Sequence, residues 1–449
     1  MKPEAARTFG KASLPALILA FLPALAAVAF SVSDPLLQRL SHELQQNKMP
    51  TPELTEQLGQ FLEKNPANYQ AHLLMGNCYE RLGLYDQALA ELELATKYGP
   101  DDPAPISELI RQQMTLGRTK STPSLLQQAQ KRFPGDPGIT FLSGNWLLSS
   151  SHDVPGAEKL FRSAAETGAR VPGLNLSLAQ IAMGKNEFEE AIKECDEELK
   201  IEPGAPEALL IKGMALAQSV QFAAALPPLK AVWALSEYKL RPGLARAYAQ
   251  AAYWNGKFEE AIEPAILQLA IDGKKEDSAM ENLLAQCLRR APRANAQEAV
   301  AAATNSLDHN ATIFKDGSFH RKVAQVLARV GMDRQAVEEY GACLRRNNDD
   351  GYALVGLARE FETNFPEYRF ALALYQRVQR FHPEIINVDN AIARLEERIR
   401  DRETDLAWRL KDWLRGSCAQ ASTEFGALLA GSSEKPQRDD KLEKSKTPR

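Results

Sequence analysis

Histidines, cysteines and glycine-rich loops are the features through which this chain could do chemistry, and none of them forms a recognised catalytic pattern. The sequence contains no HExxH, GxSxG or GxGxxG motif. Gly10-Lys11-Ala12 lacks the glycine-rich lead and the Ser or Thr of a phosphate-binding loop. None of the histidines has a two-histidine metal spacing; they are His42, His72, His152, His309, His320 and His382. We therefore expect no catalytic residue, no metal site and no cofactor, and predict that the chain is not an enzyme.

The cysteines also lack a functional pattern. They are odd in number, contain no CxxC pair, and occur at Cys78, Cys195, Cys287, Cys343 and Cys418. This distribution is not that of a disulfide framework or a zinc ribbon. We interpret the cysteines as small buried side chains. We expect no disulfide among the first four, because the repeat pattern described below places them on separate, distant helices.

The overall composition excludes several classes of protein. The 449 residues include 54 Lys and Arg against 58 Asp and Glu. The chain therefore has no excess of positive charge that would attract nucleic acid. Hydrophobic residues at 44% and charged residues at 25% are typical of a folded chain and exclude global disorder. The length predicts two or three domains, or one long repetitive domain.

The N-terminal segment, residues 1–33, has the pattern of a targeting signal. Lys2, Arg7 and Lys11 precede an uncharged, largely apolar stretch over residues 12–33. The excess of basic residues ahead of this stretch favours a cytoplasmic N-terminus and an exported body, periplasmic or otherwise extracytoplasmic.

Three interpretations of this stretch remain open. A basic start, an apolar middle and Ala27-Val28-Ala29 fit a signal peptide that is cleaved before Phe30. The length also fits an uncleaved membrane anchor, which needs roughly 20 apolar residues. The third interpretation is a helix buried within the fold.

A repeat occupies most of the remaining chain. Pro66, Pro100 and Pro134 are 34 residues apart, and each follows an amphipathic stretch. Proline just beyond a helix end is a stop signal, since it cannot continue the backbone hydrogen bonds. A fixed period of this length indicates a repeat architecture.

The unit over residues 69–102 has two helical stretches separated by Gly83. Small and aromatic residues recur in it at steps of three and four; the series is Met75, Gly76, Tyr79, Tyr85, Ala88, Leu92, Ala95 and Pro100. This pattern resembles the tetratricopeptide repeat. The resemblance implies antiparallel helix pairs that stack into a right-handed α-solenoid.

Eight further units continue the resemblance with some drift, over residues 69–383 in all. The second and third retain Gly117 and Ala129, then Gly144 and Ala157, and the ninth retains Ala358 and Ala371. The seventh has a longer turn that contains Pro292. The predicted fold class is therefore an all-α solenoid of about nine helix-turn-helix repeats.

The flanking segments fit the ends of such a solenoid. Residues 34–68 are expected to be a linker followed by an unpaired N-terminal capping helix from Pro52 to Lys64. Residues 384–430 are expected to form C-terminal capping helices, with a long amphipathic one from Asn387 to Leu414. Residues 431–449 are polar and charged, and we expect them to be disordered.

One column of the first helices is a candidate binding surface. The resemblance implies that first helices line the concave face, where partner segments bind. The residue after the Gly76 position is an amide or arginine in eight of nine repeats, and the column reads Asn77, Arg111, Asn145, Gln180, Met214, Gln250, Gln286, Gln325 and Arg359. These side chains could hydrogen-bond the backbone of an extended segment. The alternative is that the column is merely the solvated side of each helix.

A basic character in the later repeats suggests the chemistry of the partner. First-helix arginines expected on the concave face are Arg246, Arg289, Arg290, Arg321, Arg329 and Arg359. They favour an acidic segment or a free C-terminus, unless they are ordinary solvated helix residues. Trp254 precedes the Gly256 turn, and it is the aromatic residue best placed for a groove contact.

These features predict a non-catalytic scaffold of the cell envelope that binds a protein or peptide in its concave groove. No nucleic acid or small-molecule substrate is expected, and residues 12–33 would contact the membrane if uncleaved. The alternatives are a self-assembly module, or an accessory that recruits an envelope polysaccharide or cell-wall enzyme.

Overall fold

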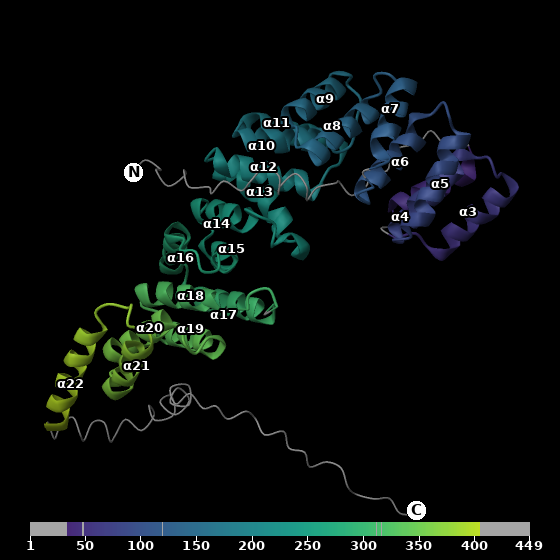
Figure 1. Cartoon of the computed structure of the whole chain (residues 1–449). Helices are drawn as coiled ribbons and strands as arrows, with labels where there is room; N and C mark the ends of the chain where they lie inside the picture. The colour runs from purple at the N-terminus through teal and green to yellow at the C-terminus, as the bar shows by residue number, and fades with distance from the viewer. Residues whose placement is uncertain (1–33, 47–48, 119, 311, 316, 405–449) are drawn as a thin grey trace, which may run out of the picture. The chain divides into compact units, whose positions relative to one another are not determined.

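The fold of the chain, seen in a computed structural model, is helical throughout the parts that can be described, which are residues 34–46, 49–118, 120–310, 312–315 and 317–404 (Figure 1). These residues form 21 α-helices and a short 3₁₀ turn, and no strand occurs among them. The predicted all-α repeat fold is confirmed. No helix within these ranges is both long enough and apolar enough to span a bilayer. The predicted signal or anchor and the polar tail fall outside them.

The chain divides into two compact blocks, with the boundary between Ala234 and Leu235. The helices of the N-terminal block are α2 (Pro35–Gln46), α3 (Pro52–Lys64), α4 (Tyr69–Arg81), α5 (Tyr85–Tyr98), α6 (Pro103–Thr115), α7 (Thr122–Arg132), α8 (Pro137–Ser151), α9 (Val154–Glu166), α10 (Leu174–Lys185), α11 (Phe188–Ile201), α12 (Pro206–Gln218) and α13 (Phe222–Trp233).

The C-terminal block begins with the 3₁₀ turn (Ser236–Tyr238). Its α-helices are α14 (Leu244–Trp254), α15 (Phe258–Ile271), α16 (Ser278–Arg290), α17 (Arg293–His309), α18 (Ser318–Arg329), α19 (Asp333–Arg346), α20 (Gly351–Thr363), α21 (Tyr368–Phe381) and α22 (Val388–Thr404).

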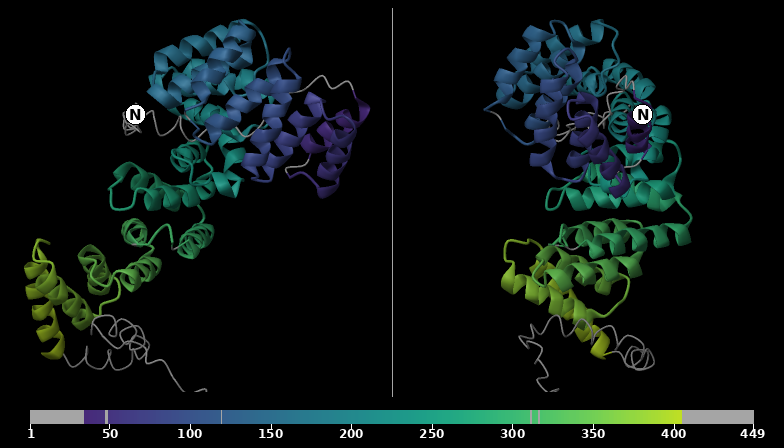
Figure 2. Two further views of the ribbon diagram at one scale, coloured as in Figure 1. Left: turned by 45° about the vertical axis from the view of Figure 1, so that its right-hand side comes forward. Right: turned by 90° about the vertical axis from the view of Figure 1, so that its right-hand side faces the viewer.

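Nine helix pairs, from α4 with α5 to α20 with α21, correspond to the nine predicted repeats. Within each block the first helix of a repeat usually packs against its partner and against the preceding second helix, as the two views of Figure 2 show. The seventh and eighth repeats depart from this pattern. The helix α17 packs more extensively on α15 than on its own partner α16, and α18 packs on α15 and α16 besides its own partner α19. The seventh repeat also differs in sequence, because its turn is longer and contains Pro292.

The turn inside most repeats requires a left-handed backbone. The residue at this position has a positive φ in seven repeats; these residues are Gly83, Gly117, His152, Asn186, Val220, Gly256 and Gly331. Glycine adopts this conformation at no steric cost and asparagine tolerates it, whereas a β-branched residue is strained there. Val220, with φ of 63°, therefore has the most strained backbone of these seven residues.

Small residues on the first helices allow close packing within a repeat. A Cβ atom added at Gly144 would lie 2.4 Å from the ring of Phe161, and one added at Gly213 would lie 2.6 Å from Leu229. Gly76 occupies the equivalent position in the first repeat, where Leu92 would lie 3.0 Å away. The second helix thus packs directly onto the backbone of the first.

The N-terminal cap differs from the prediction. The helix α3 is not unpaired, because α2 precedes it where a linker was expected. Leu37, Leu40 and Leu44 of α2 are buried with Leu54 and Leu58 of α3 in one cluster. The three leucines recur at helical spacing, and their burial explains why this segment forms a helix rather than a linker.

The last described helix, α22, packs on α21. The Arg394 guanidinium donates to both carboxylate oxygens of buried Glu362, at 2.7 and 2.9 Å. Arg398 pairs with the same carboxylate, and Leu395 is buried. The remainder of the predicted capping segment, from residue 405 onward, lies outside the described residues.

Candidate partner-binding surface

The residues of the amide and arginine column lie on consecutive first helices. In the N-terminal block it comprises Asn77 on α4, Arg111 on α6, Asn145 on α8, Gln180 on α10 and Met214 on α12. In the C-terminal block it comprises Gln250 on α14, Gln286 on α16, Gln325 on α18 and Arg359 on α20. Each block therefore has its own row, and they are treated separately.

The three glutamines of the C-terminal block form the most regular part of this column, which we call the amide row. Gln250, Gln286 and Gln325 are all half-buried, and α16 contacts both α14 and α18. None of the three amides forms a side-chain hydrogen bond within the described ranges. A half-buried amide with unused donors and acceptors has hydrogen-bonding capacity for another molecule.

The N-terminal block presents fewer accessible amides. Asn145 and Gln180 are half-buried and also lack an internal partner among the described residues. Asn77 is only 5% exposed, and its Oδ1 is buried without a hydrogen-bond partner. The Asn77 side chain is therefore packed inside the repeat rather than presented on the surface.

Arg111 holds two neighbouring first helices together. Its Nη2 lies 2.6 Å from Glu80 Oε2, and its Nε lies 2.7 Å from Glu108 Oε2. Burial alone would lower the pKa of Arg111, but the two carboxylates outweigh it, so the pKa is raised. The side chain thus links α6 to α4, and its charge is already matched.

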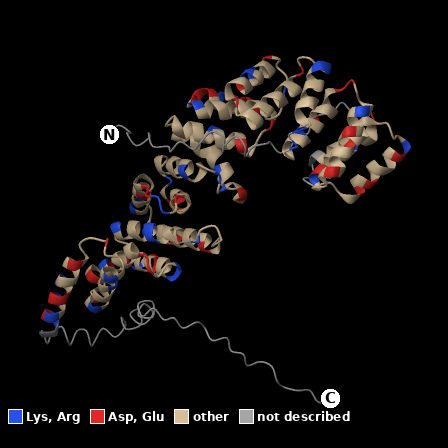
Figure 3. Ribbon diagram, in the orientation of Figure 1, with Lys and Arg blue, Asp and Glu red and all other residues tan. Residues whose placement is uncertain are grey.

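Three of the predicted groove arginines in the C-terminal block are also paired. Arg329 Nη2 lies 3.4 Å from Glu281 Oε2. Arg246 Nη2 lies 2.5 Å from Asp277 and 3.3 Å from Asp272, and Arg321 Nε lies 3.3 Å from Asp350. Arg321 additionally lies over the ring of Tyr352. Both signs of charge are interspersed along this block in Figure 3. The structure therefore offsets much of the basic character inferred from sequence alone.

The remaining predicted residues are more exposed. Arg289 and Arg359 lie on the surface, and neither forms an ion pair with any described residue. Arg289 Nη2 donates to the backbone carbonyl of Arg329 at 3.3 Å. Trp254, the last residue of α14, is 60% exposed, and its ring packs edge-on against that of Tyr253.

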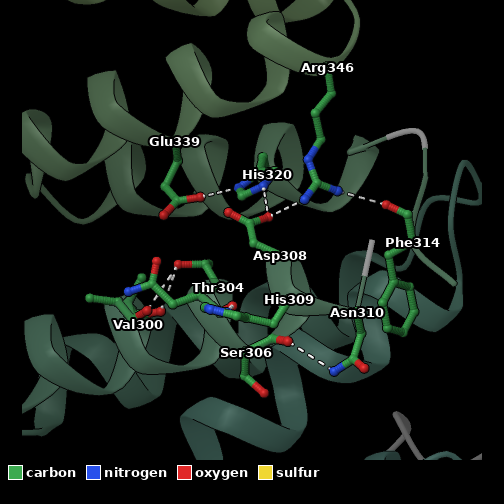
Figure 4. A network of polar contacts seen from close by, with 12 residues as sticks. Val300, Thr304, Ser306, Asp308, His309, Asn310, Phe314, His320, Glu339 and Arg346 are labelled. Atoms are coloured by element: carbon green, nitrogen blue, oxygen red, sulfur yellow. Dashed lines mark hydrogen bonds and ion pairs between the residues drawn. The ribbon is translucent and has the colours of Figure 1, made fainter. Parts of the chain in front are cut away.

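A buried polar network in the eighth repeat was missed by sequence reasoning. His320 Nδ1 lies 2.6 Å from Glu339 Oε2, and its Nε2 lies 2.8 Å from Asp308 Oδ1 (Figure 4). Arg346 binds the same Asp308 oxygen at 2.6 Å and donates to the carbonyl of Phe314 at 2.8 Å. The network joins α17 to α18 and α19, which gives it a structural role.

A repeated spacing could have revealed part of this network. His72 and Glu91 form the same contact in the first repeat, at 2.6 Å. In both repeats the histidine precedes its glutamate by 19 residues. No metal-binding group of three His, Cys, Asp or Glu side chains occurs in the portion of the chain that the structure describes.

The four described cysteines are buried and unpaired. Burial raises the pKa of Cys78, Cys287 and Cys343 to about 12 and also raises that of Cys195. A buried thiol that rarely ionises is a poor nucleophile and resists oxidation. Burial thus explains how free thiols could persist in an oxidising compartment.

The stacked helix pairs define a helical-repeat protein. Two tetratricopeptide repeat profiles match the sequence, at residues 56–112 and 176–238. These two segments of the chain are therefore tetratricopeptide repeats. The first match covers most of α3 through α6, and the second covers α10 through α13.

Several solved structures are similar to this chain in the arrangement of their helices, at low sequence identity. PilW, a widely conserved type IV pilus biogenesis factor, is 19% identical, with a TM-score of 0.36 over 49% of this chain and 98% of its own. The APC/C hetero-tetramer Cut9–Hcn1 is 16% identical, with a TM-score of 0.39 over 77% of this chain and 65% of its own.

The C-terminal part of a TPR repeat-containing protein from Cytophaga hutchinsonii is 14% identical. Its TM-score is 0.30, over 72% of this chain and 99% of its own. No curated protein matches the sequence.

Proposed function

We propose that this protein is a non-catalytic scaffold that holds an extended segment of a partner protein along the amide row. The observation that carries the proposal is that Gln250, Gln286 and Gln325 are half-buried on adjacent first helices and lack partners among the described residues. A glutamine amide both donates and accepts, so each can bond a backbone C=O or N–H of an extended chain.

Main-chain recognition of this kind would be distributed and reversible. A net hydrogen bond contributes about 1 kcal/mol, so three amides supply a modest affinity that other contacts must complete. On a solvated face these amides bond water, which the main chain of a partner would displace. Lysine and glutamate, common on solvated helix surfaces, do not occur in this column.

We further propose that the scaffold acts in the cell envelope. The support is the basic N-terminal start followed by the apolar stretch over residues 12–33. Mass spectrometry of the mature N-terminus would distinguish a cleaved signal, which begins at Phe30, from a retained anchor. A mature chain that begins at Met1 and stays in the cytoplasm would contradict the envelope proposal.

Simultaneous replacement of Gln250, Gln286 and Gln325 by Ala tests the amide row. Tagged full-length chains would be crosslinked in the native host and purified. We expect a dominant partner with the unaltered chain and a severalfold lower recovery with the triple variant, at an unchanged melting temperature.

A matched control replaces three exposed glutamines of second helices, Gln127, Gln128 and Gln376, by Ala. This control should retain full recovery of the partner. Equal recovery with both triple variants would rule out the amide row. Recovery of further copies of this chain alone would instead indicate self-assembly.

A further inference from the structure

The residues one helical turn beyond the amide row form a second, chemically different row. The fourth residue after Gln250 is Trp254, and the fourth residues after Gln286 and Gln325 are Arg290 and Arg329. Side chains four residues apart lie on the same face of a helix. An extended segment that crosses α14, α16 and α18 can therefore contact both rows.

Aromatic rings gather at the α14 end of this second row. The Trp254 and Tyr253 rings are 5.3 Å apart in an edge-to-face arrangement, and Tyr253 and Phe258 are 5.8 Å apart. The Tyr253 and Phe258 rings are half-buried, whereas Trp254 is exposed. An exposed indole supported by fixed rings is a preformed contact surface of the kind that dominates binding energy in interfaces.

Arg290 completes this surface from α16. Its guanidinium lies 5.4 Å from the centroid of Tyr253 and 5.3 Å from that of Phe258. It is exposed and forms no hydrogen bond or ion pair with any described residue. A guanidinium that stacks on aromatic faces retains N–H donors arranged to grip a carboxylate.

Unlike Arg111 and Arg246, Arg290 forms no ion pair with any described residue. Lys257 and Arg289 are also exposed and lack an ion pair in the described ranges. The nearby Glu259 accepts from Asn295 at 3.1 Å and Glu260 accepts from Tyr248 at 3.2 Å, and both donors are neutral groups. We call Tyr253, Trp254, Lys257, Phe258, Arg289 and Arg290 the aromatic–arginine patch.

We propose that this patch selects an acidic partner segment that carries an apolar or aromatic side chain next to a carboxylate. The apolar group packs on Trp254, and the carboxylate binds Arg290 with Lys257 and Arg289 nearby. The inference rests on the proposed scaffold function, to which it adds the chemistry of the partner. The amide row binds the main chain of the partner segment, and the patch contacts its side chains.

A protein segment fits the patch better than a lipid surface does. Membrane-surface binding relies on a long apolar face or on a cluster of four to eight basic residues. The patch exposes one large aromatic side chain and three cations. The patch also lies beside three amides that can hydrogen-bond a peptide backbone, and this position favours a polypeptide as the ligand.

The test uses the full chain and a fluorescent peptide of alternating Asp, Phe and Glu, with binding followed by anisotropy. A matched peptide replaces Asp and Glu by Asn and Gln. We expect the acidic peptide to bind about tenfold more tightly, in line with charge-assisted hydrogen bonds. Arg290→Gln and Trp254→Ala should each weaken acidic-peptide binding about fivefold or more, while the melting temperature stays unchanged.

Arg345→Gln is the matched control, because Arg345 is an exposed arginine of the second helix α19, lies outside the patch and the amide row, and forms no ion pair with any described residue. It should bind the acidic peptide like the unaltered chain. Equal affinity for the two peptides, or unaltered binding by the Arg290 and Trp254 variants, would overturn the inference. Patch-dependent binding to phosphatidylglycerol vesicles without any preference between the peptides would also overturn it.

These outcomes separate the inference from the scaffold proposal. The glutamine triple variant could lose the cellular partner while Arg290→Gln binds the peptide as the unaltered chain does. That result would contradict the patch proposal and support the scaffold proposal. Full recovery of the cellular partner with the glutamine triple variant and with Arg290→Gln would contradict both the scaffold proposal and the patch proposal.

Discussion

Glu360 lies on α20, is 5% exposed, and accepts a hydrogen bond of 2.8 Å from Asn364 Nδ2. No cation pairs with it in the described part of the chain. Burial raises the pKa of this carboxyl above its usual range, and the nearby Asp333 adds to the effect. A single buried acid can therefore make stability depend on pH.

Glu360→Gln should remove this dependence. Below the unfolded pKa of about 4.3 the carboxyl is protonated in both states. As the pH rises above that value, the unfolded chain releases the proton before the folded chain does, so the free energy of unfolding falls until the folded pKa is passed. The variant keeps the acceptor for Asn364 but cannot ionise.

Urea denaturation at a series of pH values measures the effect. The stability of Glu360→Gln relative to the unaltered chain should increase from pH 4 upward and then level off. Glu338→Gln, at an exposed position on α19, should show a smaller change. A stability difference for Glu360→Gln that does not vary with pH would contradict this account.

Val220 provides a second residue-level test, because it is a β-branched residue with φ of 63° and 44% exposure. Left-handed backbone costs an L-residue roughly 1–2 kcal/mol. Val220→Gly should therefore raise the free energy of unfolding by about 1 kcal/mol, after the loss of limited side-chain burial.

Asn186→Gly is the control, since Asn186 has the same turn geometry, with φ of 62°, and asparagine tolerates it. Its effect on the unfolding free energy should be smaller than that of Val220→Gly. A Val220→Gly variant that is no more stable than the unaltered chain would show that the turn is not strained.

The sequence predicted the amide positions because helix periodicity and repeat length determine where they lie. It could not predict which arginines are paired. One partner of Arg111, Glu80, is on another helix and 31 residues away, and one partner of Arg246, Asp272, lies 26 residues away at the end of α15. Such pairs depend on side-chain directions between helices, which spacing within one helix does not reveal.

At the scale of the element, the approach of the two helices in a repeat depends on glycine in the first helix. Gly144→Ala would place a Cβ atom 2.4 Å from the buried ring of Phe161, which also packs on Phe141. We expect the free energy of unfolding to fall by about 1–3 kcal/mol, as for other overpacked cores.

Gly59→Ala is the control, because no atom lies within 4 Å of a Cβ at this position in α3. Alanine has the higher helix propensity, so this variant should be neutral or more stable by up to about 1 kcal/mol. Chemical denaturation compares the two substitutions. Equal effects would show that the close helix contact does not determine stability.

Most helices were predictable because prolines, glycines and small residues mark each repeat. The exceptions have physical causes. The helix α2 was missed because its three leucines precede the first recognisable repeat, and they form a helix through burial against α3. The position of α17 was also missed, since its packing on α15 and its link through Asp308 involve contacts outside its own repeat.

At the scale of the whole molecule, repetition creates a row of amides without internal partners, and we propose that this row holds the main chain of another protein. The repeat period predicted the all-α architecture and the positions of this row. The division into two blocks has no signal in the period, because the repeat continues across residue 234. The amide row is therefore best tested within the C-terminal block.

Photocrosslinking from position 286 tests this claim most directly. A photoreactive amino acid replaces Gln286 in the full chain in its native host, and crosslinked products are identified by mass spectrometry. The account predicts one dominant partner protein, with a lower yield when Gln250→Ala and Gln325→Ala are added. Crosslinks to copies of this chain alone, or an equal yield of the same partner from position 376 on α21, would contradict it.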